Sequence, residues 1–515
     1  MENHETLMNI LNIIYLTCSI CIMCYGLHCY YLLFIFMTKQ KKARQNINDI
    51  IEQSSLSDEE LPFITFQLPV YNEAEVIERL MISAAEVDYP KDKFEIQVVD
   101  DSTDETVFII DRFIDSLKKK YDVDVYAVRR KERIGYKAGA LENAMKVCKG
   151  EFIAIFDSDF IIPKNYLRRT VPQILNSENN ACIQGRWGHL NKEENWLTRA
   201  QSVGLDGHFA AEQGARSYGN MCMNFNGTAG IWRKQAIYDA GGWEHDTLTE
   251  DLDLSYRVQM AGYKIVYDFD LVCYAELPNN IHALKSQQKR WAKGSMETAI
   301  KLMGDIFKSK LSFIQKIEAF FHLTHYSVAF FMLMISLLTL PVILYAPEFR
   351  SSISNYVFIL MFLGAFAPGV MYAGSGYVIG HTKFSIKNFP SVLVMGSGLC
   401  LNNLIAVFEA IRGKKSEFVR TPKSGSTENK KKSGRYKANL GLLQGCGELL
   451  LGIYGFITLI FYIQTNNIIF SFFIFLYTLG LLFFGTSTIT SYIRSLTFRE
   501  TEDSIDFENE EPAID

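Results

Sequence analysis

The sequence has almost no net charge. Its 515 residues include 52 Lys and Arg and 57 Asp and Glu, which gives a formal charge of −5. Proteins that bind nucleic acids carry a basic surface, so this balance gives no reason to expect a nucleic-acid partner. The average hides a strong segregation, because long uncharged apolar runs alternate with charged, periodic stretches. A chain of this length is expected to form more than one compact domain.

The sequence also lacks an internal repeat and a cysteine framework. Its ten cysteines are scattered, which predicts no disulfide scaffold and fits a reduced cytoplasmic compartment for the part outside the apolar runs. Cys18, Cys21, Cys24 and Cys29 lie close together, but within one apolar run. Packing of a membrane helix explains this group better than a metal site does.

The first apolar run, Leu11 to Met37, lacks the pattern of a cleaved signal peptide. Such a peptide has its positive charge before the apolar run, whereas here the basic cluster Lys39 to Arg44 follows it. The run is longer than the roughly 20 apolar residues that a bilayer requires. We therefore expect a retained membrane helix with its N-terminus outside and its basic flank inside, followed by a polar linker.

From residue 62 the sequence alternates between strands and amphipathic helices. Buried strands are predicted at Phe63–Val70, Phe94–Val99, Val123–Val128 and Phe152–Phe156. This alternation predicts a mostly parallel sheet with right-handed crossovers. Ligands of such sheets bind beyond the carboxyl ends of the strands. The acidic clusters Asp100-Asp101 and Asp157-Ser158-Asp159 directly follow two of these strands, so they are expected at that edge.

Further apolar runs follow residue 318. Two runs within 319–379 and two within 444–491 are predicted to span a membrane. The run Pro390 to Ile411 is ambiguous, because it carries Asn402, Asn403 and Glu409. If it does not cross, all the Lys- and Arg-rich loops fall on the inside, including the most basic one at Arg412 to Lys437. The positive-inside rule therefore favours about five spans and an interfacial position for this run.

These patterns predict a division of the chain into eight segments. They are a membrane helix with a basic flank (1–44), a linker (45–61), an α/β domain (62–282), interfacial amphipathic helices (283–318), two membrane helices (319–379), an interfacial helix with a basic loop (380–443), two membrane helices (444–491) and an acidic disordered tail (492–515).

The two acidic strand ends could hold a nucleotide and a metal ion. Asp100 and Asp101 could accept hydrogen bonds from a base or a ribose, although a helix-capping role explains them equally well. Asp157 and Asp159 could hold Mg²⁺ against a diphosphate. Their position in the same sheet pattern as the first cluster favours a metal site over a plain polar strand end.

A basic, glycine-containing segment precedes a predicted helix. Arg133 and Lys137 supply two cations, and Gly135 and Gly139 allow close approach of a ligand. The N-terminus of such a helix would suit an anion. A solvated basic turn explains the same residues nearly as well.

Two further motifs lie in the stretch from Asn224 to Trp291. Glu250 and Asp251 begin a helical run, where a carboxylate tends to stay ionised and could act as a general base toward a sugar hydroxyl. A helix-capping carboxylate would also explain either residue.

The second motif, Gln287-x-x-Arg290-Trp291, places its three side chains on neighbouring faces of one helix. Trp291 offers a flat face for a sugar ring, and Arg290 could pair with a diphosphate through two hydrogen bonds. A basic interfacial helix with a tryptophan at the headgroup level is an equally good explanation.

The order of these motifs resembles that of the processive family 2 glycosyltransferases. The similarity is greatest to the cellulose synthase-like branch, which includes plant mannan and glucan synthases. The amino-acid sequence is most similar to the family in four segments: Asp100–Asp104, Gly135–Leu141, Phe225–Gly230 and Gln287–Trp291. The resemblance covers residues 62–291 closely and the membrane part more loosely. Only one predicted span precedes the α/β domain, whereas bacterial cellulose synthases have several.

The resemblance implies an α/β GT-A domain, Rossmann-like with a mostly parallel sheet, joined to an α-helical transmembrane region. It implies an inverting transfer, dependent on Mg²⁺ or Mn²⁺, of a hexose from a nucleotide sugar such as UDP-glucose or GDP-mannose. The acceptor would be a growing β-linked polysaccharide that leaves through the membrane helices. A non-processive transfer to a lipid, as in glucosylceramide-type enzymes, is the alternative. A transporter or scaffold without catalysis explains the acidic motifs less well.

The resemblance also implies a location and a set of partners. The catalytic domain would face the cytoplasm, and the membrane lipids and the sugar donor and acceptor would be the partners, with any accessory subunit left open. The short loops fit a bacterial inner membrane, and a Golgi membrane is the eukaryotic alternative.

Carried over residue by residue, the resemblance assigns roles at the site. The catalytic residues would be Asp251 as general base, Glu250 and Asp157. The nucleotide sugar would be bound by Tyr71, Glu73, Asp100, Asp101, Lys137, Asp157, Gln287, Arg290, Thr421 and Lys423. The acceptor would be bound by Trp291, Glu250 and Gly227, and Asp159 would ligate the metal.

Thr421 and Lys423 belong to Phe418–Lys423, which resembles a gating loop with the usual pattern Phe-x-Val-Thr-x-Lys. Arg420 here replaces the valine and Pro422 stiffens the segment, so the two phosphate-binding side chains are retained while the motion is altered.

Overall fold

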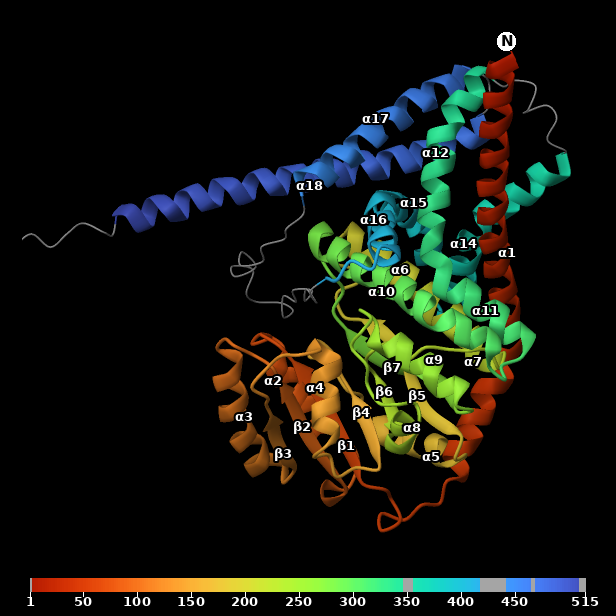
Figure 1. The fold of residues 1–515 in the computed structure, drawn as a ribbon. Coiled ribbons are helices and arrows are strands. Elements are labelled where there is room, and N and C mark those ends of the chain that lie inside the picture. Colours follow the sequence, from red (N-terminus) through yellow and green to blue (C-terminus); the bar gives the residue numbers. More distant parts are fainter. Residues whose placement is uncertain (1, 346–354, 417–440, 465–467, 509–515) are drawn as a thin grey trace, which may run out of the picture.

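The computed structural model describes residues 2–345, 355–416, 441–464 and 468–508 (Figure 1). An α/β domain occupies one end of the molecule, and long helices occupy the other. Helix α10 (Ile281–Lys308) lies between these two regions, and α1 (Glu2–Gln53) runs along both of them.

Within the described residues, seven strands form one sheet in the order β3-β2-β1-β4-β6-β5-β7. The strands are β1 (Ile64–Val70), β2 (Phe94–Asp100), β3 (Asp124–Val128), β4 (Phe152–Ile155), β5 (Asn180–His189), β6 (Gly230–Arg233) and β7 (Lys264–Ala275). All neighbours pair in parallel except β6, which is antiparallel to β4 and to β5. The predicted mostly parallel sheet is therefore confirmed, while β5, β6 and β7 were not predicted.

Helices cover both faces of this sheet, and apolar residues fill the layers between them. They are α2 (Ile77–Ala85), η1 (Lys91–Lys93), α3 (Thr106–Tyr121), α4 (Tyr136–Met145), α5 (Tyr166–Leu175), α6 (Trp196–Asp206), the π-helix η2 (Gly207–Gln213), α7 (Gly214–Tyr218), α8 (Lys234–Asp239) and α9 (Glu250–Met260). The strands β1, β2 and β4 are buried along their whole length. Strands buried on both faces read as continuous apolar runs, which is why the sequence predicted them well.

Helix α1 is longer than the sequence indicated. It continues through Gln53, so residues 45–53 of the expected linker are helical. Within the extension, the side-chain oxygen of Asn48 accepts a hydrogen bond from Arg169 of α5 at 3.1 Å. Just before it, Arg44 forms a two-bonded ion pair with Asp270 of β7, at 2.6 and 2.9 Å. Its guanidinium also lies 4.7 Å from the ring centroid of Phe269. A contact with a distant strand, invisible in the local pattern, thus holds the helix against the α/β domain.

The second region consists of helices alone. After α10 come α11 (Phe313–Thr324), η3 (His325–Ser327), α12 (Val328–Tyr345), α14 (Asn355–Ile379), α15 (Thr382–Gly398), α16 (Cys400–Ile411), α17 (Leu442–Gln464) and α18 (Ile468–Glu508). Among the described residues, five helical segments are long and apolar enough to cross a membrane: Thr6–Gln53, Phe313–Tyr345, Phe362–Ile379, Leu442–Gln464 and Ile474–Arg494. These segments indicate an integral membrane protein.

Two elements of this region bear on the predicted topology. Helices α15 and α16 meet at a bend of 43°, so together they form a broken span or a re-entrant pair rather than a straight one. The interfacial position expected for Pro390–Ile411 stays a prediction. Helix α18 continues to Glu508, so residues 492–508 of the expected disordered tail are helical. Extending an existing helix avoids the cost of nucleation, which favours this continuation.

Candidate active site

A cleft lies beyond the carboxyl ends of β1, β2 and β4, where α9 and α10 close over the sheet. Of the predicted site residues, Tyr71, Glu73, Asp101, Lys137, Asp157, Asp159, Gly227, Glu250, Asp251, Gln287, Arg290 and Trp291 all line it. These residues span more than two hundred positions of the chain. Their assembly around one space follows from the parallel topology, which brings successive strand ends to the same edge.

The two aspartates at the end of β2 differ in position. Asp101 lines the cleft and accepts two hydrogen bonds from Arg130, at 2.6 and 2.8 Å. Asp100 points into the protein, where it accepts from Arg129 at 2.7 Å and from the backbone N–H of Ser102. Among the described residues, Asp100 is not one that lines the cleft. The geometry therefore favours Asp101 for contact with a base.

Arg133 adds a cation beside Asp101 that the predicted site residues did not include. Its guanidinium lies 3.4 Å from the ring centroid of Tyr71 and 5.0 Å from that of Tyr136. This is a cation–π arrangement, and Arg133 and Tyr71 both line the cleft. Both cations of the segment Arg133–Lys137 thus border the cleft, while Ile134 between them is exposed to solvent.

Lys137 lies among the acidic side chains of the cleft. Its Nζ donates to Asp157 Oδ1 at 2.5 Å and to the carbonyl of Gly227 at 2.8 Å. Burial alone would lower the pKa of Lys137, but the charges of Asp157, Glu250 and Asp251 outweigh it and raise the pKa overall. The ammonium therefore stays protonated and is held where an anionic ligand could take the place of Asp157.

The Asp157-Ser158-Asp159 segment is tied to the first strand end. The Ser158 hydroxyl donates to Glu73, and Arg79 donates to the backbone carbonyl of Asp159 at 3.1 Å. The Asp157 side chain is 37% exposed, whereas the Asp159 residue is only 5% exposed. Both carboxylates border the cleft. Such hard oxygen donors fit a divalent cation of the Mg²⁺ or Mn²⁺ type.

Glu250 and Asp251 form the first turn of α9, on the opposite wall of the cleft. Burial, and after it the charge of the neighbouring Glu250, outweigh the opposing charge of Lys137, and the pKa of Asp251 is raised to about 7. Burial likewise raises the pKa of Glu250. A carboxylate that titrates near neutral pH is well matched to accept a proton.

Gly227 faces Asp251 across a very short gap. A Cβ at this position would lie 3.0 Å from Asp251 Oδ2, and the φ of +77° is one that side chains rarely adopt. Glycine is therefore needed both by the backbone and by the space in front of the carboxylate.

Helix α10 brings Gln287, Arg290 and Trp291 to the cleft. Its close approach to α9 depends on Gly294, where a Cβ would lie 2.5 Å from Thr249 Cγ2 and 2.8 Å from the Thr249 backbone nitrogen. The residue before Glu250 thus packs directly on α10. This contact places the helix that carries an arginine and a tryptophan beside the raised-pKa carboxylates.

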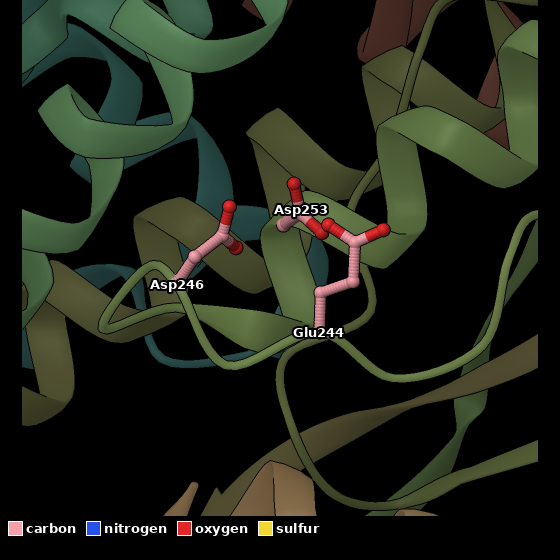
Figure 2. Close-up of side chains that lie close together, drawn as sticks. All are labelled: Glu244, Asp246 and Asp253. Carbon is pink, nitrogen blue, oxygen red and sulfur yellow. The ribbon is translucent and has the colours of Figure 1, made fainter.

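A second group of carboxylates, Glu244, Asp246 and Asp253, lies close together on the other side of α9 (Figure 2). The three side chains point toward one another, as ligands of a metal ion would. However, Lys301 Nζ already lies 2.5, 2.7 and 3.0 Å from their oxygens. Arg257 adds a second cation, 2.7 Å from Asp253. We therefore interpret this triad as a salt-bridge cluster.

Several cleft residues were not among the predicted site residues. Trp187 and His189 of β5, Asn226 and Glu276 all line the cleft. Asn226 accepts a hydrogen bond from Gln213 at 2.6 Å and contacts His208 at 3.2 Å, both from the π-helix η2. Asn226 belongs to the segment Phe225–Gly230, which could have indicated it, whereas no motif marked Trp187, His189 or Glu276. Thr421 and Lys423 lie outside the described residues.

Comparison with known proteins gives consistent matches. Residues 62–294 match a family model described as glycosyltransferase like family 2. A probable glucomannan 4-beta-mannosyltransferase of Arabidopsis thaliana, number 15, is 33% identical over 416 residues, which cover 78% of this chain and 74% of that protein. Probable glucomannan 4-beta-mannosyltransferase 11 of the same plant is 32% identical, over 78% of this chain and 91% of that protein.

Solved structures are similar at lower identity. The mannosyltransferase PcManGT from Pyrobaculum calidifontis, in complex with GDP-Man and Mn²⁺, is 17% identical with a TM-score of 0.46, over 76% of this chain and 100% of that one. TarS 1–349 of S. aureus, in complex with UDP-GlcNAc, is 17% identical with a TM-score of 0.39, over 62% of this chain and 92% of that one.

Proposed function

This chain belongs to the family 2 glycosyltransferases, in the cellulose synthase-like group, and from that premise we propose that it is a membrane-bound polysaccharide synthase. It transfers a hexose with inversion from a nucleotide sugar to a growing β-linked glycan. Mannose from GDP-mannose is the first candidate donor, because the similar plant proteins are named 4-beta-mannosyltransferases. Glucose from UDP-glucose is the second.

The observation that carries this proposal is the composition of the cleft described above. Its sheet side presents Asp157, Asp159 and Lys137, while its helix side presents Asp251 and Arg290. The first group suits a nucleoside diphosphate with its cation, and the second supplies a base and a counter-charge. A transfer from a sugar nucleotide to a hydroxyl needs all of these functions at one place.

The donor half of the cleft would hold the nucleotide through groups on the sheet edge. Asp101 would accept hydrogen bonds from the base, with Arg130 keeping its carboxylate in place. Tyr71 would lie under Arg133 beside it, and Glu73 would orient the following loop through Ser158. Lys137 would turn from Asp157 toward the diphosphate.

Asp159, together with Asp157, would hold Mg²⁺ or Mn²⁺, which when bound neutralises the charge of the departing nucleoside diphosphate. Gln287 and Arg290 would bind the same diphosphate from the α10 side, where an arginine can pair with two of its oxygens. The negative charge that develops on the leaving group is thus matched by cations of the chain.

Asp251 would act as the general base. Its raised pKa keeps the carboxylate basic enough to accept the proton of the acceptor hydroxyl as that oxygen bonds to the sugar C1 and the C1–diphosphate bond breaks. Attack from the face opposite the leaving group produces inversion. Trp291 would stack on the acceptor sugar, with Glu250 and the open space at Gly227 beside it.

The membrane helices would receive the product. We expect the catalytic domain to face the cytoplasm, because this orientation places the Lys- and Arg-rich loops inside. The polymer would then leave through the helices that adjoin α10.

The test is an assay of purified protein in detergent or vesicles with Mn²⁺ or Mg²⁺. GDP-mannose, UDP-glucose and UDP-N-acetylglucosamine are supplied separately in radiolabelled form, and the product is sized. A long polymer from GDP-mannose or UDP-glucose is the expected result. A single sugar on a lipid would instead identify a lipid glycosyltransferase, and the absence of both product and released nucleotide with every donor and acceptor would contradict the proposal.

A further inference from the structure

Helix α10 has two functional faces. Gln287, Arg290 and Trp291 line the cleft. Lys285, Lys289 and Lys293 recur every four residues, and at 3.6 residues per turn they fall on the other side of the helix. This second face lies against α16 and α18, and Figure 1 shows α10 between the α/β domain and those two helices.

Lys285 is fully buried and makes an ion pair with a membrane helix. Its Nζ donates to both carboxylate oxygens of Glu448 in α17, at 2.6 and 2.7 Å, and to the hydroxyl of Thr488 in α18, at 2.6 Å. Lys285 and Glu448 are both 0% exposed. Gln444 donates to the same carboxylate at 3.0 Å. All three N–H bonds of the ammonium therefore have acceptors.

The neighbouring lysines continue this pattern toward α16. Lys289 Nζ lies 3.1 Å from Glu409 near the end of α16. Lys293, which is 1% exposed, donates to the carbonyl of Lys414 and to the hydroxyl of Ser416. Lys285 is also anchored through its backbone, because Asn402 of α16 donates to its carbonyl at 3.1 Å. The lysine face of α10 thus joins α16, α17 and α18.

A buried ion pair between two helices constrains their relative position more than an apolar contact does. Apolar side chains of neighbouring helices can slide past one another at little cost, whereas a buried charge displaced from its partner loses its compensation. An ionisable residue inside a membrane span is costly and is retained where it has a specific task. Glu448 is such a residue, since it lies within the candidate span Leu442–Gln464.

We propose that Lys285 and Glu448 form a positioning pair for the transfer reaction. The pair sets the axial position of α10 against α17 and α18, and thereby the position of Gln287, Arg290 and Trp291 over the cleft. Lys285 precedes Gln287 by two residues, so a shift of the lysine along the helix axis moves the cleft residues with it. This inference rests on the proposed function, because the positioned residues are those assigned to the diphosphate and acceptor.

The experiment compares Glu448→Gln, Lys285→Met and the exchanged pair Lys285→Glu/Glu448→Lys with the wild type. Glu448→Gln keeps the size of the side chain and removes its charge. For protein that elutes as a single folded species, we expect both single variants to lower kcat about 10- to 100-fold, the cost of a small misplacement of reacting groups. Binding of GMP or UMP, which would contact only the sheet side, should stay within about threefold. The exchanged pair should recover part of kcat.

Arg44→Met is the matched control. It removes another ion pair between a membrane helix and the α/β domain, away from the cleft, so thermal stability should fall without a loss of kcat per folded molecule. The proposal is overturned if the single variants keep the kcat of the wild type, or if all three variants fail to fold, which would make the pair a folding determinant. Turnover by the wild type is measured first, so that its absence with every donor counts against the proposed function and not against the pair.

Discussion

Two acidic groups lie on the two faces of α9, and they differ in how a nearby lysine pairs with them. Glu250 and Asp251 face the cleft, while Asp253 faces the triad with Glu244 and Asp246. Each group has a lysine nearby. Lys301 contacts all three carboxylates of the triad directly, whereas Lys137 donates to Asp157 and to the Gly227 carbonyl.

The difference in pairing explains the difference in chemistry. Burial alone would lower the pKa of Lys301, but its hydrogen bonds with Asp246, Glu244 and Asp253 outweigh burial and raise the pKa, so the ammonium stays protonated. In the cleft, burial and the adjacent carboxylate dominate over Lys137 and raise the pKa of Asp251. A group of neighbouring carboxylates therefore indicates a salt-bridge cluster when a lysine contacts all of them. It indicates a general base when burial raises the pKa of a carboxylate more than the nearby cation lowers it.

The sharpest test of this comparison is Asp251→Asn. The amide keeps the shape of the side chain but cannot accept the proton, so transfer should fall about 10²- to 10⁴-fold. Binding of the nucleotide sugar should be retained, because the donor contacts lie on the sheet side. Turnover and donor binding of the purified variant are the measurements, and near-normal turnover would show that Asp251 is not the base.

Asp159→Asn should have the next largest effect. Removing one hard ligand should lower kcat by about 10²-fold, which corresponds to about 2.7 kcal/mol of lost charge stabilisation, and should raise the Mn²⁺ concentration needed for half-maximal activity. Asp246→Asn in the triad is the matched control and should leave the metal requirement unchanged. An equal shift in both variants would argue that the triad is the metal site.

Lys137 and Lys301 should have different effects on the pH dependence of kcat/KM. Because Asp251 must be deprotonated to act as a base, activity should fall as the pH drops through about 7. Lys137 lowers the pKa of Asp251, so Lys137→Met should move the acidic limb of the pH profile, where activity falls, to higher pH. Lys301→Met should leave the limb in place. A flat profile in the wild type would contradict the raised pKa.

The smallest expected effect on activity belongs to Lys301→Met. This change leaves Asp253 buried without one of its cations, so the free energy of unfolding should fall by about 1–3 kcal/mol. Turnover per folded molecule should stay within about twofold. Thermal unfolding together with the activity assay measures both quantities, and a large loss of kcat without a loss of stability would mean that the cluster acts in the reaction.

The sequence determined the parts of this protein that depend on local patterns. Continuous apolar runs predicted the strands β1 to β4, and the acidic residues that follow β2 and β4 fall at the cleft because parallel strands end at one edge. The motif Gln287-x-x-Arg290-Trp291 indicated the helix that covers the cleft. The GT-A class, the glycosyltransferase activity and the family were predicted from the resemblance that the order of the motifs carries.

Only the tertiary structure decided which of these groups pair. It turned Asp100 toward Arg129 and Asp101 toward the cleft, and it brought Trp187 and His189 to the site without any motif. It also extended α1 to reach Asp270 and joined Lys285 to Glu448 across 163 residues of sequence. The physical reason is that the burial and charge environment of a side chain depend on partners far away in the chain, which no local periodicity records.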